Sequence, residues 1–564
     1  MSIRLDTHRS AETSSLAQTS SIASENLDAR AHRVAKVVLQ DFSKTYGQLD
    51  KLASLKARIS SLQEIKEKLS TTSETLRGVE TKLKAQTKTL EGEITGLTKN
   101  QIKLAEQATK IATKLADIST RLNQIPDPKP LTFFQKFLRL IGLYSNPQDK
   151  KASLEADQAA YGKKKQEIQT ELKKLEDQLS TKENTVSQLE AGLLQNEKLL
   201  SELSTASAEV ERAHTDLKAA SSSFQTKYDA QLTNAHTYYQ RHFDAPLTSL
   251  RGTEREEAVD MRARHCAFRM FQQQNAIPKE ISKRLSGSTL ADSVQSTLRE
   301  LSDCQSIDRV TADRFKSLLQ TIADIDSATV LVSKAPATEK PLLIAGLVDK
   351  ILDKLEALPP GGRLLLPGGY QNEGGGHAVL YEITRQEGEG FSFNVYNTGE
   401  GSGIFSTNVR EYPQATEKTL KNPEFWKGLL EFTSHSYEGT LQTGLIDGEM
   451  AAVHDHLGKH LGAERSGKSI PSQSWGNCTH TCLRSWISTQ VSETSYRAFH
   501  EEMRSKAASR CQDLLPTLNA ADRRFLEEPT VKALQDKVKI IQSDSMLTRG
   551  LYYGGQMIRG LFSS

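Results

Sequence analysis

Four polar residues in the C-terminal third of the sequence could together perform thiol chemistry. His377 follows three glycines, Asn397 closes the segment FSFNVYN, and Gln473 lies five residues before Cys478. A thiol nucleophile needs an imidazole to take its proton, a polar side chain to orient the imidazole, and a donor for the developing oxyanion. We therefore expect Cys478 to be the nucleophile, His377 the general base, Asn397 the orienting residue and Gln473 the oxyanion donor.

Strands and one helix must position these residues. The segments RLLLPGGY, HAVLYEI and FSFNVYN are separated by glycine-rich turns and predict β-strands. If RQEGEG folds one strand back beside the other, His377 and Asn397 lie at neighbouring strand ends. A helix beginning near Cys478 would lower the thiol pKa, because its first N–H groups carry partial positive charge. We expect Trp475 to shape the mouth of the cleft.

The order of these residues resembles the cysteine-peptidase clan that includes adenain, the ubiquitin-like-protein (SUMO) proteases and the YopJ-type effectors. There, His precedes a strand, Asp, Asn or Glu ends the next strand, and Gln lies shortly before Cys. Domains in proteins of intracellular, chlamydia-related and Legionella-like bacteria are also similar. The resemblance covers residues 361–490 and implies a papain-like or Ulp-like fold. It implies hydrolysis of a peptide or isopeptide bond, or acyl transfer as in the YopJ-type enzymes.

Each residue also has a structural interpretation without catalysis. His377 fits a solvated or hydrogen-bonded histidine at the start of a strand. Asn397 fits a turn residue before Gly399, since asparagine tolerates left-handed backbone conformations. Cys478 fits a small buried apolar residue. Their joint presence with Gln473 is what favours the catalytic interpretation.

Two other motifs match known sites only in part. GAERSGKS, from Gly462 to Ser469, fits the phosphate-loop pattern but lacks a strand before it and a helix after it. Zinc-capable side chains occur in HDHLGKH and in CTHTC, without the Glu of a metalloprotease helix or a second ligand pair. We therefore expect neither a cofactor nor a metal.

Leucine or isoleucine recurs every seven residues from Leu55 to Ile125, which predicts a coiled coil. Prolines follow, and a second seam runs from Ile168 to Leu217. Two similar lengths predict an antiparallel hairpin within one chain, with parallel self-association as the alternative. The hairpin tip, residues 126–149, contains an aromatic segment, Phe133–Tyr144. This segment either caps the open end or contacts a membrane surface or partner.

These patterns predict a mainly α protein with a C-terminal α+β domain. The expected organisation is a disordered Ser/Thr-rich N-terminus (1–34), a coiled-coil hairpin (35–245), a helical domain (246–358), an α+β cysteine-peptidase-like domain (359–495), and C-terminal helices with a tail (496–564).

Composition restricts the class of protein. The chain has 564 residues, 73 of them basic and 70 acidic, a balance that argues against a nucleic-acid binder. Five cysteines are too few for a disulfide framework, which favours a reducing, cytoplasmic location. The sequence contains no stretch of about 18 apolar residues, so we expect no transmembrane helix. The Ser/Thr-rich start, which lacks the apolar run of a secretory signal peptide, fits either an effector exported into a host cell or an ordinary disordered tail.

We therefore expect a peptidase-like bacterial effector that acts on a host protein or a ubiquitin-like modifier. The coiled coil would position it on a partner or on a second copy of the chain. The alternatives are a scaffold or adaptor whose C-terminal domain is an inactive binding module, and an acyltransferase.

Overall fold

The computed structural model describes most of the chain. The described residues are 29–120, 152–271, 277–285, 289–372, 375–388, 390–399, 409–433, 448–467 and 478–543. They form two compact units. The first comprises the described parts of Met1–Gly47 and Ser61–His214, and the second comprises Gln48–Ser60 and the described part of Thr215–Ser564.

Several sequence predictions fall outside the described residues. These are the N-terminal segment up to residue 28, the hairpin tip at residues 126–149, the C-terminal tail after residue 543, and the site residues Gln473 and Trp475.

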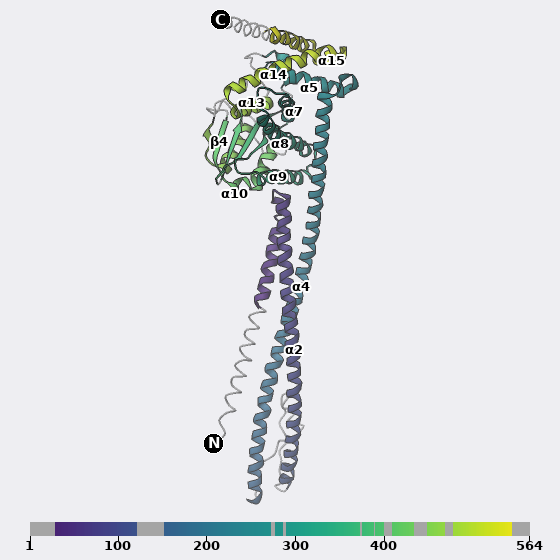
Figure 1. The fold of residues 1–564 in the computed structure, drawn as a ribbon. Helices are drawn as coiled ribbons and strands as arrows, with labels where there is room; N and C mark the ends of the chain where they lie inside the picture. Colours follow the sequence, from purple (N-terminus) through teal and green to yellow (C-terminus); the bar gives the residue numbers. More distant parts are fainter. Residues whose placement is uncertain are drawn as a thin grey trace. The chain divides into compact units, whose positions relative to one another are not determined.

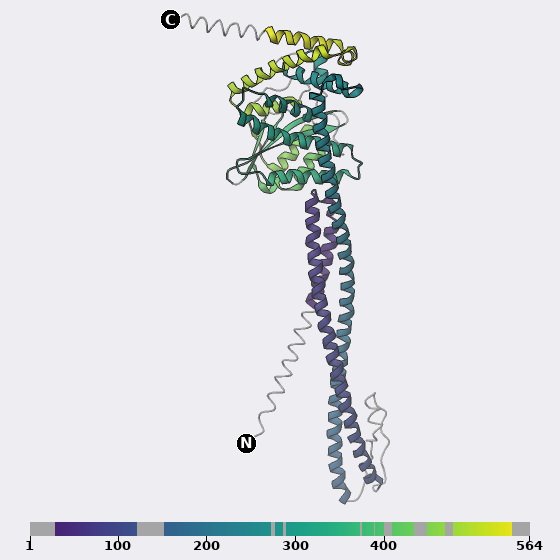
Figure 2. The same cartoon turned by 45° about the vertical axis from the view of Figure 1, so that its right-hand side comes forward.

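The first unit is built from long helices. A helix over residues 29–46 accompanies α2 (Leu55–Thr120) and α4 (Ala152–Asp244), which run side by side in Figures 1 and 2. Lys66 forms an ion pair with Glu211 at 2.5 Å, and Lys182 forms one with Glu93. Residue numbers rise along one helix as they fall along the other, so the two helices are antiparallel.

Leucines at seven-residue intervals on α2 are buried where the helices meet: Leu62, Leu69, Leu76 and Leu83. Asn196 of α4 interrupts this apolar contact and is itself fully buried. Its Nδ2 donates to the carbonyl of Leu76 at 3.0 Å, and its Oδ1 lies 3.3 Å from Nε2 of His32. A polar residue in such a seam fixes the alignment of the helices, because only one register gives it partners.

The second unit contains an antiparallel sheet with the strand order β1-β2-β3-β4-β5. The strands are β1 (Arg363–Asn372), β2 (Gly375–Arg385), β3 (Phe391–Tyr396), β4 (Val409–Ala415) and β5 (Arg465–Ser466). The first three are the strands that the sequence predicts. The last two were not predicted, and β5 lies within the described part of the phosphate-loop motif, where it pairs with β4.

Helices make up most of the rest of the described second unit (Figure 1). They are α5 (Gly252–Phe271), α6 (Lys279–Leu285), α7 (Leu290–Ser302), α8 (Arg309–Lys334), α9 (Lys340–Glu356), α10 (Glu417–Leu420), α11 (Pro423–Thr433), α12 (Gly448–Leu461), α13 (Cys478–Gln490), α14 (Glu493–Leu514), α15 (Ala520–Leu526) and a helix over residues 528–543. Short 3-10 turns occur at Leu49–Lys51, Leu247–Ser249 and Leu515–Thr517.

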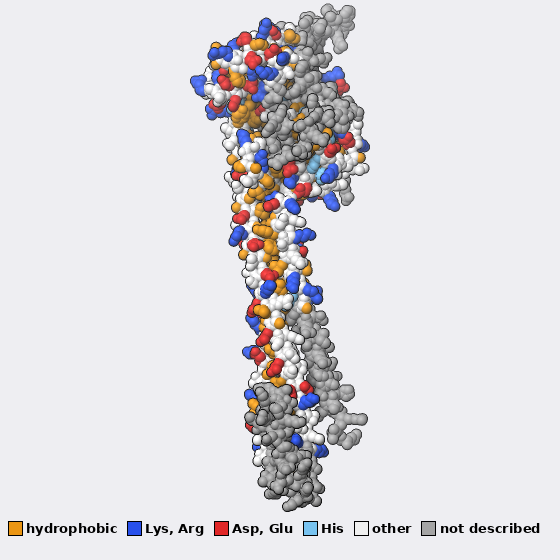
Figure 3. All heavy atoms as spheres, turned by 180° about the vertical axis from the view of Figure 1, so that it is seen from behind, with side chains coloured by type: hydrophobic (Ala, Val, Ile, Leu, Met, Phe, Trp, Pro, Cys, Tyr) orange, Lys and Arg blue, Asp and Glu red, His pale blue; other side chains and the backbone are white. Residues whose placement is uncertain are grey.

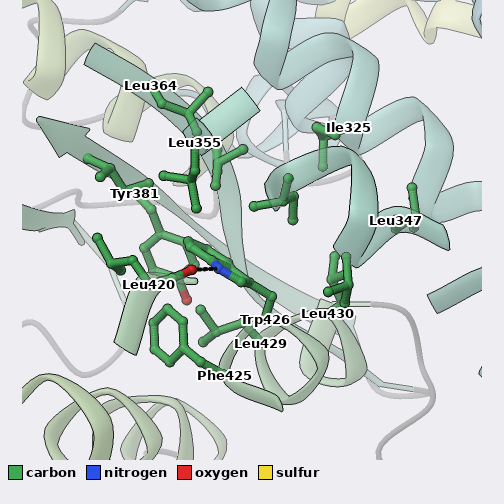
Figure 4. Close-up of a cluster of buried hydrophobic side chains, with 14 of the residues drawn as sticks. Ile325, Leu347, Leu355, Leu364, Tyr381, Leu420, Phe425, Trp426, Leu429 and Leu430 are labelled. Carbon is green, nitrogen blue, oxygen red and sulfur yellow. Dashed lines mark hydrogen bonds between the residues drawn. The ribbon is translucent and has the colours of Figure 1, made fainter. Parts of the chain in front are cut away.

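Both faces of the sheet are buried, which explains why its strands are apolar at successive positions. Val379 and Tyr381 of β2 face a core formed with α9, α11 and α12, shown in part in Figure 4. Trp426 packs within this core and donates its indole N–H to the carbonyl of Leu420 at 2.6 Å. Leu380, which points to the opposite face, packs in a second core with α7, α8, α13 and α14. The sheet is thus a rigid support for α13.

A third core joins α5, α6, the C-terminal half of α14 and the helices that follow it. Cys266 and Cys511 are buried there. The protein is therefore mainly helical with a small C-terminal antiparallel sheet, as the sequence predicts at this level. Among the described helices, none is long and apolar enough to cross a membrane.

Candidate active site

Three of the four predicted catalytic residues meet in the second unit. Nε2 of His377 lies 2.8 Å from Oδ1 of Asn397. The side chain of the same histidine acts on Cys478 closely enough to lower the pKa of the thiol, and the sulfur accepts the backbone N–H of Ala378 at 3.4 Å. One imidazole therefore contacts both the thiol and the amide.

The neighbouring strand β1 holds the segment of β2 that carries His377. Gly369 pairs with Ala378 and has a φ of +107°. A Cβ atom at this position would lie 1.9 Å from the carbonyl oxygen of His377, so only glycine fits. Next to it, Tyr370 pairs with His377, and the two rings lie 6.5 Å apart. The closely placed β1 backbone thus limits where His377 can lie.

Asn397 directly follows β3 and is buried, with 3% of its surface exposed. Its Oδ1 also accepts the backbone N–H of Gly399 at 3.1 Å, which sets the orientation of the amide. Because an amide oxygen only accepts hydrogen bonds, Nε2 of His377 must carry a proton to donate to it. Nδ1 of His377 is then the nitrogen that can accept the proton of the thiol.

Cys478 is the first residue of α13 and is half-buried. Burial of the thiol alone would raise its pKa. The hydrogen bond and charge of His377, together with the backbone N–H groups of Ala378 and Thr479, outweigh burial and lower the pKa of Cys478 below its ordinary value. The surroundings of Cys478 thus make its thiol easier to deprotonate to the nucleophilic thiolate than the thiol of an ordinary cysteine.

Contacts from two other helices fix the first turn of α13. Ser293 of α7 donates its hydroxyl hydrogen to Oγ1 of Thr479 at 2.9 Å. The ring of His480 stacks on Phe268 of α5, with centroids 3.8 Å apart. These contacts hold the residues that immediately follow Cys478.

A buried carboxylate fixes the other end of α13. Glu382 of β2 is 2% exposed and accepts the indole N–H of Trp486 at 3.1 Å and the hydroxyl of Tyr396 at 2.8 Å. Arg363, at 3.2 Å, and Gln490, at 3.4 Å, also donate to it. Glu382 therefore ties β1, β2, β3 and α13 together.

No sequence pattern predicts these supporting residues. Ser293, Phe268 and Glu382 come from segments far from Cys478 in the sequence, and no local pattern marks them. Glu382 alone carries a signal, because it lies between apolar residues in a predicted strand. A carboxylate buried there needs hydrogen-bond partners, since an unpaired one is costly.

Two of the zinc-capable side chains, His456 and Cys482, have other partners. Nε2 of His456 lies 2.9 Å from the carbonyl oxygen of Phe425, and Cys482 donates to the carbonyl of Thr479 at 3.4 Å. Within the described ranges, no group of three or more His, Cys, Asp or Glu residues is arranged to hold a metal ion.

In comparisons with known proteins, no family model matches the chain and no curated protein matches it. The case for a function therefore depends on the geometry of the site.

Proposed function

We propose that this protein is a thiol hydrolase of the cysteine-peptidase type. Cys478 acts as the nucleophile, His377 as the general base and acid, and Asn397 as the residue that orients the imidazole. The observation that carries the proposal is the position of His377, whose ring contacts Asn397 on one side and the thiol on the other. Gln473 remains the expected oxyanion donor, and the backbone N–H groups in the first turn of α13 are further candidates.

The reaction follows from these contacts. His377 takes the proton of Cys478, and the sulfur attacks the carbonyl carbon of the substrate. His377 then gives that proton to the leaving amine as the C–N bond breaks, which leaves a thioester on Cys478. A water molecule loses a proton to His377 and attacks the thioester. The C–S bond breaks, the acid product leaves, and the thiol regains its proton.

For the substrate, we propose a peptide or isopeptide bond in a host protein or a ubiquitin-like modifier. This part depends on the resemblance of the order His377, Asn397, Gln473 and Cys478 to the adenain and SUMO-protease clan. The small sheet with α13 packed on one face is compatible with that clan. An acyltransferase would form the same thioester and pass the acyl group to an amine of the acceptor instead of to water.

We also propose that α2 and α4 form an intramolecular coiled-coil hairpin that positions the enzyme on a protein partner. The buried seven-residue leucine repeat of α2 and the antiparallel ion pairs support this proposal. On the face drawn in Figure 3, Lys, Arg, Asp and Glu side chains are interspersed. Such a surface suits a protein partner better than a nucleic acid, which requires a basic patch.

The test is covalent labelling of the full-length protein by a panel of ubiquitin-like probes that carry a C-terminal thiol-reactive group. We expect labelling of wild type and of Cys304→Ala, a control because Cys304 is also half-buried but lies outside the site. Cys478→Ala should lose labelling entirely, and His377→Ala should be labelled far more slowly.

A library of peptides tests hydrolysis in parallel, with products identified by mass spectrometry. If neither the probes nor the library react with wild type, or if Cys478→Ala reacts equally well, the protein is not a thiol hydrolase. If Cys478→Ala still captures its protein partners as wild type does while all labelling is absent, the scaffold interpretation is correct.

A further inference from the structure

A cavity of about 690 Å³ lies in the second unit, between α5, α7, α14 and the end of α4. Its described lining includes none of the residues of the cysteine site. The volume is typical of sites for small molecules, which span about 300–1,000 Å³. The cavity therefore has room for a ligand that the proposed hydrolase does not use.

The cavity has an uneven distribution of charge. Three arginines line it, Arg262, Arg299 and Arg510, and each is only partly exposed. Its acidic residues lie at the exposed rim: Asp244, Asp303 and Asp513. The cationic side chains of the lining are thus less exposed than the anionic ones.

These guanidinium groups are only partly neutralised. Arg510 lies 3.6 Å from the exposed Asp303 and 3.2 Å from Nε2 of His265. Arg262 donates to the backbone carbonyls of His242, at 2.7 Å, and Ala245, at 2.6 Å, and not to a carboxylate. Arg299 forms an ion pair with the exposed Asp244 at 2.5 Å, but its buried Nε has no hydrogen-bond partner among the described residues. Burial and the nearby charge of Arg299 lower the pKa of Arg262, and the charge of Asp244 only partly opposes them. An anion in the cavity would relieve this crowding of positive charge.

Apolar side chains complete the lining: Phe243, Pro246, Leu247 and Leu514. They lie beside the arginines, so the cavity offers an apolar surface next to N–H donors. This combination suits a molecule with an oxyanion on an apolar body, and it suits a bare inorganic anion less well.

We propose that this cavity binds an amphiphilic anion, a carboxylate or phosphate carried on an apolar body, through Arg299 and Arg510. Fatty acids and aromatic phosphate esters both have this chemistry. The proposal is independent of the hydrolase activity.

The test is isothermal titration calorimetry on the full-length protein. Decanoate and phenyl phosphate are the probes, while decanol and inorganic phosphate test the apolar body and the anion separately. We expect at least one of the two probes to bind at a single site. The probe that binds shows whether the cavity prefers a carboxylate or a phosphate head group. Arg299→Gln and Arg510→Gln should each weaken binding about tenfold to a hundredfold, as expected for a lost charged hydrogen bond. The control is Arg309→Gln, because Arg309 is highly exposed on α8.

A further variant avoids any loss of folding from the arginine substitutions. Ser302 is exposed at the rim of the cavity, and Ser302→Trp should block the entrance while leaving all three arginines in place. We expect this variant to keep the wild-type circular dichroism spectrum and lose binding. Binding that is equal in Ser302→Trp and wild type, equally tight binding of decanol, or no binding of either probe would overturn the proposal.

Discussion

Replacing Glu382 by alanine should destabilise the second unit and loosen α13. Glu382 is buried and accepts hydrogen bonds from Trp486 and Tyr396. In Glu382→Ala, the fully buried indole N–H of Trp486 loses the acceptor that Glu382 provides. Tyr396 keeps only a weaker contact, with Thr489 at 3.2 Å.

The magnitude follows from these contacts. An unsatisfied buried donor costs about 1–3 kcal/mol, and loss of a hydrogen bond to a charged group costs about 1.5–3 kcal/mol. Removing the carboxylate also removes its own desolvation penalty, so we expect the free energy of unfolding to fall by about 2–4 kcal/mol. That is a large share of the roughly 5–15 kcal/mol that stabilises a typical domain. Glu382→Gln keeps an acceptor oxygen and should lose less than half as much.

Urea unfolding followed by tryptophan fluorescence measures this loss in the relevant unit. All three tryptophans of the chain, Trp426, Trp475 and Trp486, lie beyond residue 215, so the signal does not report on the long helices of the first unit. The control is Glu411→Ala, because Glu411 is only half-buried and its ion pair with the exposed Arg465, at 3.8 Å, should contribute less than about 1 kcal/mol. A loss in Glu382→Ala no larger than that of Glu411→Ala would refute this account of how α13 is held.

Three further predictions concern residues around the site. Asn397→Ala should lower kcat about 100-fold on any substrate that wild type cleaves, because the imidazole loses its orienting partner. Gly369→Ala should lower the melting temperature and slow alkylation of Cys478, since its Cβ would collide with the carbonyl of His377, whereas Gly388→Ala has open space and should change neither. Finally, burial, together with the nearby charge of Arg410, lowers the pKa of His454 to about 4. The unfolded chain therefore binds a proton that the folded chain does not, and the unfolding free energy should fall by at most about 1.4 kcal/mol per pH unit from this residue as pH drops from about 6.5 to 4. Urea titrations at several pH values, with and without His454→Phe, measure this contribution.

The parts of the site that could be predicted from sequence are those with local signals. The segments around His377, Asn397 and Cys478 predicted two strands and a helix start, and the structure has β3 ending just before Asn397 and α13 beginning at Cys478, whereas β2 begins at Gly375, two residues before His377. The heptad repeat of α2 likewise predicted the buried leucines from Leu55 to Leu83, because periodicity encodes the face of a helix, whereas Leu90, Leu97 and Leu104 of the same repeat are only half-buried.

The remaining features depend on contacts between distant segments. β4 begins close after the glycine-rich region that follows Asn397, and its sequence VREYPQA contains a proline and charges that are unusual in a strand. The stacking of Phe268 on His480 and the arginine-lined cavity arise only when α5, α7 and α14 pack together. Short-range propensity and periodicity carry no information about such packing.

The central claim is that His377 activates the thiol of Cys478, and the pH dependence of alkylation tests it most directly. The rate of iodoacetamide modification of Cys478, followed by mass spectrometry of its peptide, should give a pKa below that of an ordinary cysteine in wild type. In His377→Ala the hydrogen bond and the charge are lost while burial remains, so the pKa should rise. Equal pKa values in wild type and His377→Ala, both at the ordinary cysteine value, would contradict the account.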